Sequence, residues 1–408
     1  MHLSFNRWLK LSYLNLLIVA LAGVVLRYKI AFALPFIDQK NLLHGHSHFA
    51  FAGWLTQVLI VLMVQYLVKY KGEIIFRKYR LVLCGNFVTA YGMLIFFILQ
   101  GYSTWAIIFS TASILISFLF AFQFWKDLNI VPSKNNSRYW FKAALLFNVV
   151  SSLWLFYLAY MMVTKTVVQS WYLAAVYYFL HFQYNGWFFF AIVGLLYAML
   201  ESHHVLLKHG KFIFWLFCIS CMPAFFLSVL WVPATVIIYW LVVASAIAQL
   251  GSWLLLISQL LKNSSGIKSS FPLNSRRLLL LSAAALTIKL LLQLGSTHPA
   301  LSHLAFGFRP IVIGYLHLVL LGVISIFILG YTFSVNQPGK SRYWMGGAWI
   351  FITGIIINEI LLMAQGVTGL KYIIIPYINW MLFSAAIIMF TGVLVINLHN
   401  LKYKGNTT

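Results

Sequence analysis

Three histidines at every second position open the second apolar run of the chain, and their imidazoles could bind a metal or a haem. His44, His46 and His48 lie in the segment HGHSHFAFAG, and the apolar run continues to Leu67. An imidazole inside a bilayer is costly without a partner, so its presence there needs a reason. At about 100° per helical residue, His46 and His48 point to nearly opposite faces, whereas His44 and His48 share one. We therefore expect this segment to serve two neighbouring centres.

Two further histidines, His181 and His317, lie inside apolar runs far along the chain. Neutral imidazole is the commonest protein ligand of transition metals and the usual axial ligand of haem iron. A haem between two helices needs one histidine from each side, an apolar slot and cations near its propionates. His48 and His317 are our candidates for the axial pair, and Arg27 and Arg309 for the propionate cations. The alternative is that these histidines only form hydrogen bonds between ordinary packed helices.

The composition is that of a polytopic membrane protein. Of the 408 residues, 62% are hydrophobic and 8% are charged, and the mean hydropathy is +0.92. A soluble core cannot absorb so much apolar surface. The chain has 28 Lys and Arg against 5 Asp and Glu, but the basic residues lie in short loops between apolar runs. We therefore expect a lipid bilayer as the partner and no nucleic acid.

The apolar runs predict an all-α chain with about twelve spans of roughly 20 residues each. Most basic residues lie in the even-numbered loops and at both ends of the chain, which predicts that these are cytoplasmic. We predict one transmembrane domain over residues 1–408, in the inner or plasma membrane of the cell. The expected spans are about 10–33, 43–68, 81–100, 103–125, 142–164, 171–200, 211–230, 233–261, 277–295, 309–333, 344–365 and 374–398.

This topology brings the intramembrane histidines to one depth. Spans 2, 6 and 10 all enter from the outer face. At about 1.5 Å per residue, His48 lies about 8 Å down its span, His317 about 10 Å and His181 about 14 Å. Two more histidines, His298 and His303, belong to the ninth, outer loop. We predict that this histidine layer is the functional site.

With these features the chain resembles the catalytic subunit of the haem–copper oxidase and nitric oxide reductase superfamily. The segment HSHFAFAG at 46–53 is the strongest local match. The segment LHFQYNGW at 180–187 is similar to the sixth-span pattern of nitric oxide reductases, with Asn185 where that pattern has Glu. The resemblance implies a subunit I-like bundle with one low-spin haem b, held by His48 and His317. It also implies a second metal, copper or iron, at His181.

The chain departs from the family at the second metal. The seventh span has no histidine pair, and Tyr315 stands where the tenth span should carry its first histidine. We therefore expect a degenerate relative that performs electron transfer or nitric oxide chemistry rather than full oxygen reduction. Such a role would need a small redox partner or an accessory subunit at the outer face. Tyr315 as a weak anionic ligand, and His46 or His44 beside His181, remain alternative ligands.

Two charged residues lie deep in spans, Lys289 in the ninth and Glu359 in the eleventh. Isolated charges there are costly unless paired, so they are candidate catalytic groups together with Tyr315. We expect them to pair with each other or to relay protons. Polar neighbours that include Gln293 and Asn358 would extend such a network. Cys218 and Cys221 are soft ligands that suit cuprous copper, although apolar filling is the simpler interpretation.

Two other functions compete with a haem protein. A twelve-span proton-coupled secondary transporter would use the histidines, Lys289 and Glu359 as its substrate path. A copper- or haem-handling assembly factor is the third hypothesis. Transporters of this size usually show a repeat of two halves with broken helices at matching positions. No such repeat is evident in the sequence, which favours haem.

Overall fold

The computed structural model describes residues 4–231, 235–298, 301, 309–336 and 342–402. These residues form helices and their connections, without a strand, and twelve of the helical segments are long and apolar enough to cross a membrane. Each predicted span overlaps one of them, with ends that differ by a few residues. The prediction of an all-α, twelve-span membrane protein is therefore confirmed. The orientation in the membrane stays a prediction, and His303 lies outside the described residues.

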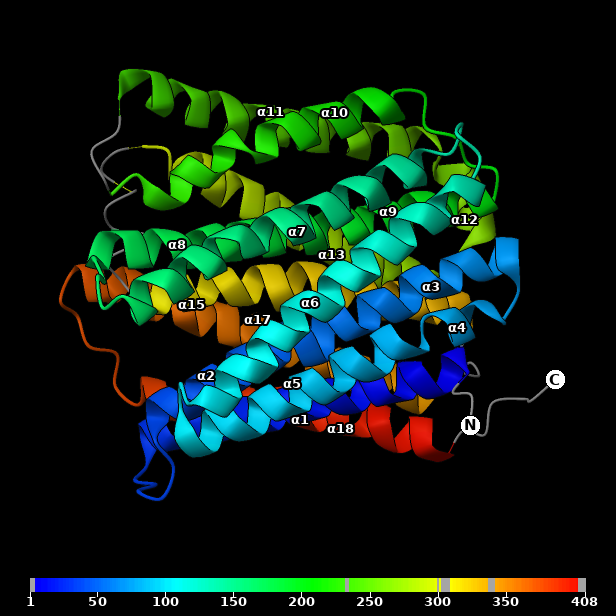
Figure 1. Cartoon of the computed structure of the whole chain (residues 1–408). Coiled ribbons are helices and arrows are strands. Elements are labelled where there is room, and N and C mark those ends of the chain that lie inside the picture. The colour runs from blue at the N-terminus through cyan, green and yellow to red at the C-terminus, as the bar shows by residue number, and fades with distance from the viewer. Residues whose placement is uncertain (1–3, 232–234, 299–300, 302–308, 337–341, 403–408) are drawn as a thin grey trace. The chain divides into compact units, whose positions relative to one another are not determined.

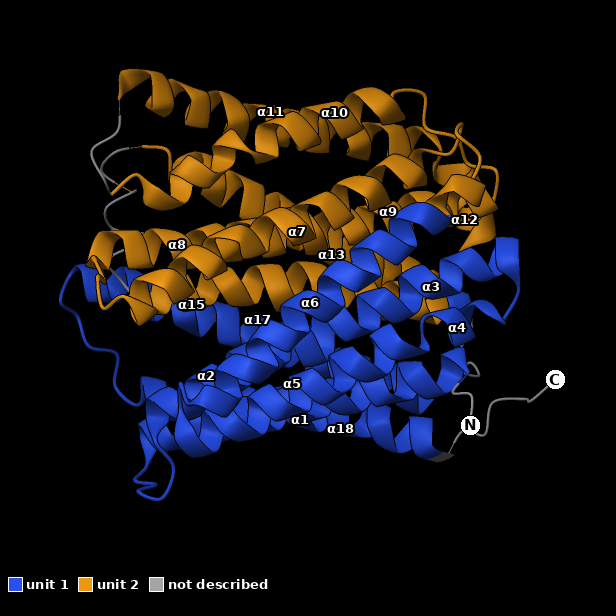
Figure 2. Cartoon of the chain, in the orientation of Figure 1, with its two compact units in different colours: residues 1–127, 335–408 blue, residues 128–334 orange. Residues whose placement is uncertain are grey.

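The chain divides into two compact units, coloured separately in Figure 2. The first contains residues 1–127 and 335–408, and the second residues 128–334. Figure 1 labels the helices of both.

The first unit contains the spans from the two ends of the chain. Its helices α1 and α18 pack against each other, as do α17 and α18 (Figure 1). The last pair approaches closely at glycines: a Cβ on Gly392 would lie 2.3 Å from the backbone nitrogen of Phe351. Small residues allow such contact between membrane helices. The elements are α1 (Phe5–Ala31), α2 (Gln39–Phe49), η1 (Ala50–Thr56), α3 (Gln57–Lys71), α4 (Ile75–Lys78), α5 (Arg80–Gln100), α6 (Thr104–Asp127), α17 (Arg342–Leu370) and α18 (Ile378–Lys402).

The second unit contains the middle spans of the chain. Helix α7 packs along α8 and α9, and α11 lies between α10 and α13. Its elements are η2 (Leu128–Ile130), α7 (Asn136–Val163), α8 (Gln169–His181), η3 (Phe182–Phe188), α9 (Phe189–Ser202), α10 (Gly210–Cys221), η4 (Pro223–Val229), α11 (Val236–Lys262), α12 (Ser264–Ser270), α13 (Leu273–Gly295), α15 (Arg309–His317), η5 (Leu318–Ser325) and α16 (Ile326–Asn336).

Three spans change from α-helix to π-helix, and each change follows a histidine. Helix α8 ends at His181, α15 ends at His317, and α2 ends one residue after His48; η3, η5 and η1 are the π-helical segments that follow. His181 comes 133 residues after His48, and His317 comes 136 residues after His181. The change from α-helix to π-helix after a histidine therefore recurs in every fourth span, which is a repeat of long period.

The π-containing spans are also the most enclosed. In the most apolar stretch of each span, 78% of the residues are buried in the second span and 72% in the sixth, against 50% in the tenth and at most 44% in the others. Of the histidines in these spans, His181 is buried, whereas His44, His46, His48 and His317 are half-buried.

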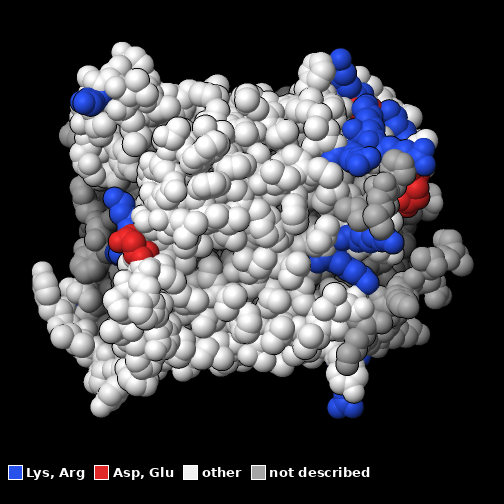
Figure 3. Space-filling view, turned by 60° about the horizontal axis from the view of Figure 1, so that its bottom comes forward, with Lys and Arg blue, Asp and Glu red and all other residues white. Residues whose placement is uncertain are grey.

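Basic residues gather where helices end. In the face shown in Figure 3, Lys and Arg side chains cluster at helix ends, and the surface along the helices is white. At one such end the buried carboxylate of Asp127 accepts hydrogen bonds from Lys71 at 2.6 Å, Lys78 at 2.6 Å and Tyr79 at 2.8 Å. Burial and the neighbouring Asp127 carboxylate raise the pKa of Tyr79 well above its usual value. This cluster joins the loop after α3 to the end of α6.

Candidate functional site

The histidine segment presents two faces, as its spacing predicts. His44 and His48 lie on the face of α2 that packs on α5. The His48 ring stacks on Phe97 with ring centroids 4.3 Å apart and planes 11° apart. The His44 ring meets Tyr102 edge-on at 4.7 Å. Among the described residues the His48 ring forms no hydrogen bond, so Phe97 is what fixes its plane.

His46 lies on the opposite face, against α1. Its ring is hydrogen-bonded to the backbone of Val19, and a Cβ on Gly23 would lie 3.5 Å from its Cε1 atom. Arg27 is one further turn along the same face of α1 and interacts electrostatically with both His46 and Glu359. The first unit thus brings together His46, Arg27 and Glu359.

The sequence alone predicts separate sites for these three residues. Arg27 follows Val19 and Gly23 at intervals of four residues, which puts all three on one face of α1. That spacing places Arg27 on the face of α1 that contacts His46, but it does not reveal which residues of α2 and α17 pack there. Glu359 also accepts a hydrogen bond from Asn358 Nδ2 at 3.1 Å, so Asn358 extends the polar group as predicted.

Polar side chains from neighbouring spans hold the π-helical segment η1. Asn15 donates to the carbonyl oxygen of Gly53 at 2.5 Å and accepts from the Tyr91 hydroxyl at 2.9 Å. Asn86 donates to the Ala52 carbonyl at 3.0 Å. A π turn pairs each N–H with the carbonyl five residues earlier, which disturbs the regular α pattern of acceptors. These donors stabilise the disturbed turn.

The other two π segments have equivalent donors. Ser282 of α13 donates to the Val323 carbonyl of η5 at 2.7 Å. The Cys221 thiol donates to the Asn185 carbonyl of η3 at a sulfur–oxygen distance of 3.7 Å. Each π segment therefore accepts a side-chain hydrogen bond from an adjacent span, close to its histidine.

His181 is enclosed, and both ring nitrogens are bonded. Nε2 lies 2.9 Å from the Cys221 carbonyl oxygen, and Nδ1 lies 3.2 Å from the Asn185 amide nitrogen. Because a carbonyl only accepts and an amide nitrogen only donates, the proton of the neutral ring is on Nε2. A metal at His181 would have to replace one of these bonds.

His317 has a different pattern. Its Nδ1 donates to the Ile313 carbonyl at 2.9 Å, which puts the lone pair of the neutral ring on Nε2. Histidines that bind a metal usually donate their other N–H in this way. Tyr315, two residues earlier, packs edge-on against Tyr184 of η3 with centroids 6.1 Å apart. Arg309 is exposed at the start of α15.

Lys289 begins a chain of hydrogen bonds inside the second unit. Only 4% of its surface is exposed. It donates to Gln293 Oε1 at 2.6 Å, and Gln293 Nε2 donates to Gln249 Oε1 at 2.9 Å. Gln293 thus extends the network as predicted. Lys289 and Glu359 belong to different units, so their pairing stays a prediction.

The described residues do not supply a ligand set for a second metal. Nowhere in the described ranges do three His, Cys, Asp or Glu side chains come together. His181 is bonded at both nitrogens, His46 lies beside the Arg27 cation, and His298 is exposed at the end of α13. Cys84, Cys218 and Cys221 form no disulfide.

Comparison with protein-family models finds no matching family, and comparison with curated proteins finds no matching protein.

Proposed function

We propose that this protein is a haem-binding redox protein of the inner or plasma membrane, in which His48 and His317 are the axial ligands of one haem b. The observation that carries this proposal is the π-helical segment that follows each intramembrane histidine. π-helical turns are rare and occur frequently at functional sites. Three of them at equivalent positions, each held by a polar side chain, support a functional role for the histidines.

The surroundings of each proposed ligand, taken separately, support this role. The Nδ1–H bond of His317 to Ile313 directs the Nε2 lone pair away from the helix backbone and fixes the ring. The His48 ring is held by stacking on Phe97 and forms no hydrogen bond to another described residue. When bound, the haem would supply a one-electron couple. The chain's part is to orient the two rings and to provide an apolar, aromatic surrounding.

A complete second metal centre is not part of the proposal. His181 uses both nitrogens for hydrogen bonds, and the Arg27 cation beside His46 opposes a metal cation there. The protein in this proposal is a degenerate relative of the haem–copper oxidase and nitric oxide reductase superfamily. Electron transfer or nitric oxide chemistry fits one haem better than four-electron reduction of oxygen does.

The rival proposal is a secondary transporter, favoured by the buried Lys289 and its polar neighbours. Transporter folds commonly contain two related halves with broken helices at matching positions. Here the irregular segments recur three times, in every fourth span. This pattern supports the haem proposal over the transporter.

A visible spectrum separates these proposals. The full-length protein, purified in detergent from haem-replete cells, should show a b-type spectrum that changes on reduction. His48→Ala and His317→Ala should each remove this low-spin spectrum, whereas His181→Ala should keep it. His203→Ala, at an exposed histidine, is the matched control. A colourless preparation, or a spectrum that survives in both axial variants, refutes the proposal.

A further inference from the structure

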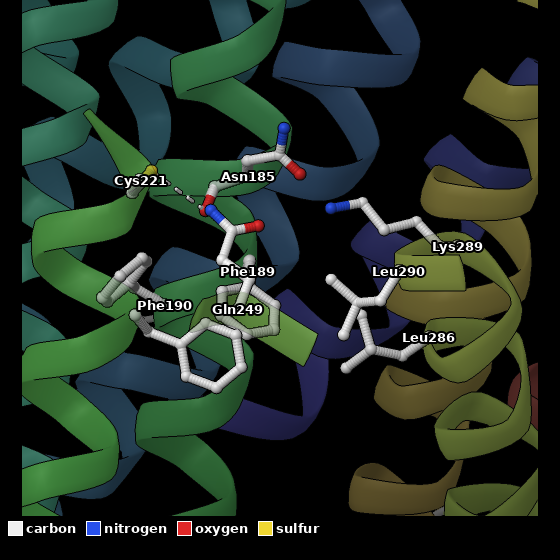
Figure 4. Close-up of a pocket in the computed structure, with 9 residues that line it drawn as sticks. Asn185, Phe189, Phe190, Cys221, Gln249, Leu286, Lys289 and Leu290 are labelled. Atoms are coloured by element: carbon white, nitrogen blue, oxygen red, sulfur yellow. Dashed lines mark hydrogen bonds between the residues drawn. The ribbon is translucent and has the colours of Figure 1, made fainter. Parts of the chain in front are cut away.

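A lysine lies inside the span formed by α7, close to the beginning of that helix. Lys142 comes six residues after Asn136, the first residue of α7, and thus about 9 Å along the helix. Lys289 of the same unit points into the interior, toward the side chains of Asn185 and Gln249 (Figure 4). Lys142, in contrast, is only half-buried. A surface lysine near the end of a membrane helix extends its ammonium group toward the headgroup region of the bilayer.

A second cation, Arg138, lies one turn before Lys142, and the two interact electrostatically. Residues four apart lie on the same side of a helix, and like charges at this spacing destabilise it. The guanidinium group is fixed in place: Nη1 donates to the Val131 carbonyl at 3.2 Å, and Nη2 donates to the Asn129 side-chain oxygen at 3.1 Å. Its other N–H groups can donate to a further acceptor. An anionic group that contacts both side chains would replace the repulsion by attraction.

The acidic residue nearest to these cations in α9 is bound on a different side of α7. Glu201 is the only acid in the sequence between 128 and 334. Its carboxylate accepts hydrogen bonds from the backbone and the hydroxyl of Ser137 at 3.1 and 2.6 Å, and Ser137 is buried. Because successive helical residues are about 100° apart, Ser137 is not on the face that carries Arg138 and Lys142.

The face of α7 that carries the two cations continues as an exposed apolar strip. Leu146 lies one turn after Lys142 with 51% of its surface exposed, and Leu153 follows two turns later with 52% exposed. At about 100° per residue, these four residues lie within about 80° of one another around the helix. A phospholipid has the complementary parts in the same order, a phosphate followed by acyl chains. Inorganic phosphate would use only the cationic part of this face.

We propose that this face of α7 binds one anionic phospholipid. Its phosphate group accepts hydrogen bonds from Arg138 and Lys142, and an acyl chain lies along Leu146 and Leu153. Arginine suits a phosphate because its N–H groups lie in one plane at the spacing of the phosphate oxygens, and basic residues at the ends of membrane helices bind anionic headgroups. This site is independent of the haem proposal and needs no haem for its test.

The first test is the thermal stability of the full-length protein in detergent. Unfolding is compared with added phosphatidylglycerol, phosphatidylcholine or inorganic phosphate at equal ionic strength. A ligand that binds only the folded state stabilises it, so we expect phosphatidylglycerol to raise the unfolding temperature by several degrees relative to the other two. Lys142→Gln should abolish this difference, and Leu146→Asn should reduce it. Lys268→Gln removes the same charge from an exposed lysine of α12 and should leave the difference unchanged.

The second test locates the lipid directly. A cryo-electron microscopy map of the wild-type protein in phosphatidylglycerol nanodiscs should show a headgroup within hydrogen-bonding distance of Lys142 Nζ and the Arg138 guanidinium. Neither this map nor the comparison of the three additives needs a variant, so the question is decided even if Lys142→Gln does not fold. Water alone at the two cations overturns the proposal. So does equal stabilisation by both lipids, an effect that persists in Lys142→Gln, or equal stabilisation by inorganic phosphate, which would indicate a site for free phosphate.

Discussion

The replacement of Asn15 by leucine tests whether neighbouring side chains hold the π segment after His48. Asn15 is fully buried, donates to the Gly53 carbonyl and accepts from the Tyr91 hydroxyl. Leucine has a similar volume but leaves both groups without this partner. A hydrogen bond between membrane helices contributes about 0.6 kcal/mol on average, and a buried polar group left unpaired costs about 1–3 kcal/mol. Tyr91 is only half-buried, so we expect a total loss of about 2–4 kcal/mol.

The assay is reversible unfolding in mixed detergent micelles, with Ser12→Ala as the matched control. Ser12 is equally buried in the same helix, but its hydroxyl donates to Trp8 four residues earlier in α1. Its loss leaves no carbonyl of another span unpaired and should cost less than about 1 kcal/mol. Tyr91→Phe removes one of the two bonds and should give an intermediate loss. Equal stability of Asn15→Leu and Ser12→Ala would refute the reasoning.

Two further perturbations follow from packing and charge. Gly392→Ala should destabilise the protein by at least about 2 kcal/mol in a thermal unfolding assay, because the new Cβ would meet the backbone of Phe351 at 2.3 Å. Gly346 has open space around it, so Gly346→Ala should be neutral in the same assay. Asp127→Ala should cost about 1–3 kcal/mol, less at high salt, because it leaves two lysine ammonium groups unpaired; unchanged stability at low salt would contradict this. The same variant should lower the pKa of Tyr79 only part of the way toward its usual value, since burial is the larger cause of the shift; absorbance near 295 nm during an alkaline titration measures it.

The spans were predictable because length and apolar composition alone define a helix that crosses a bilayer. The two faces of the histidine segment were also predictable, because helical spacing fixes the angle between His46 and His48. Gln293 and Asn358 were named because they are polar residues of the same spans, and each is hydrogen-bonded to the charged residue near it. These predictions rest on local geometry, which the order of residues determines directly.

The π segments were not predicted. A turn in which each N–H bonds to the carbonyl five residues earlier has no recognisable pattern in an apolar sequence. The cluster of His46, Arg27 and Glu359 depends on how α1, α2 and α17 pack, which spacing within one helix does not reveal. The long-period recurrence of histidines at 48, 181 and 317 was present in the numbering. This recurrence becomes significant only with the structure, in which a π-helical segment follows each of the three histidines.

An extra residue in a helical turn acts as a rotational offset between the two halves of a membrane helix. Removing one residue from 50–56 would restore α geometry and rotate His48 by about 100° relative to α3. The ring would leave Phe97, while the lower half of the span would keep its packing. In each π-containing span, the end that carries the histidine can therefore change direction by insertion or deletion of a single residue, without any rearrangement of the rest of the bundle.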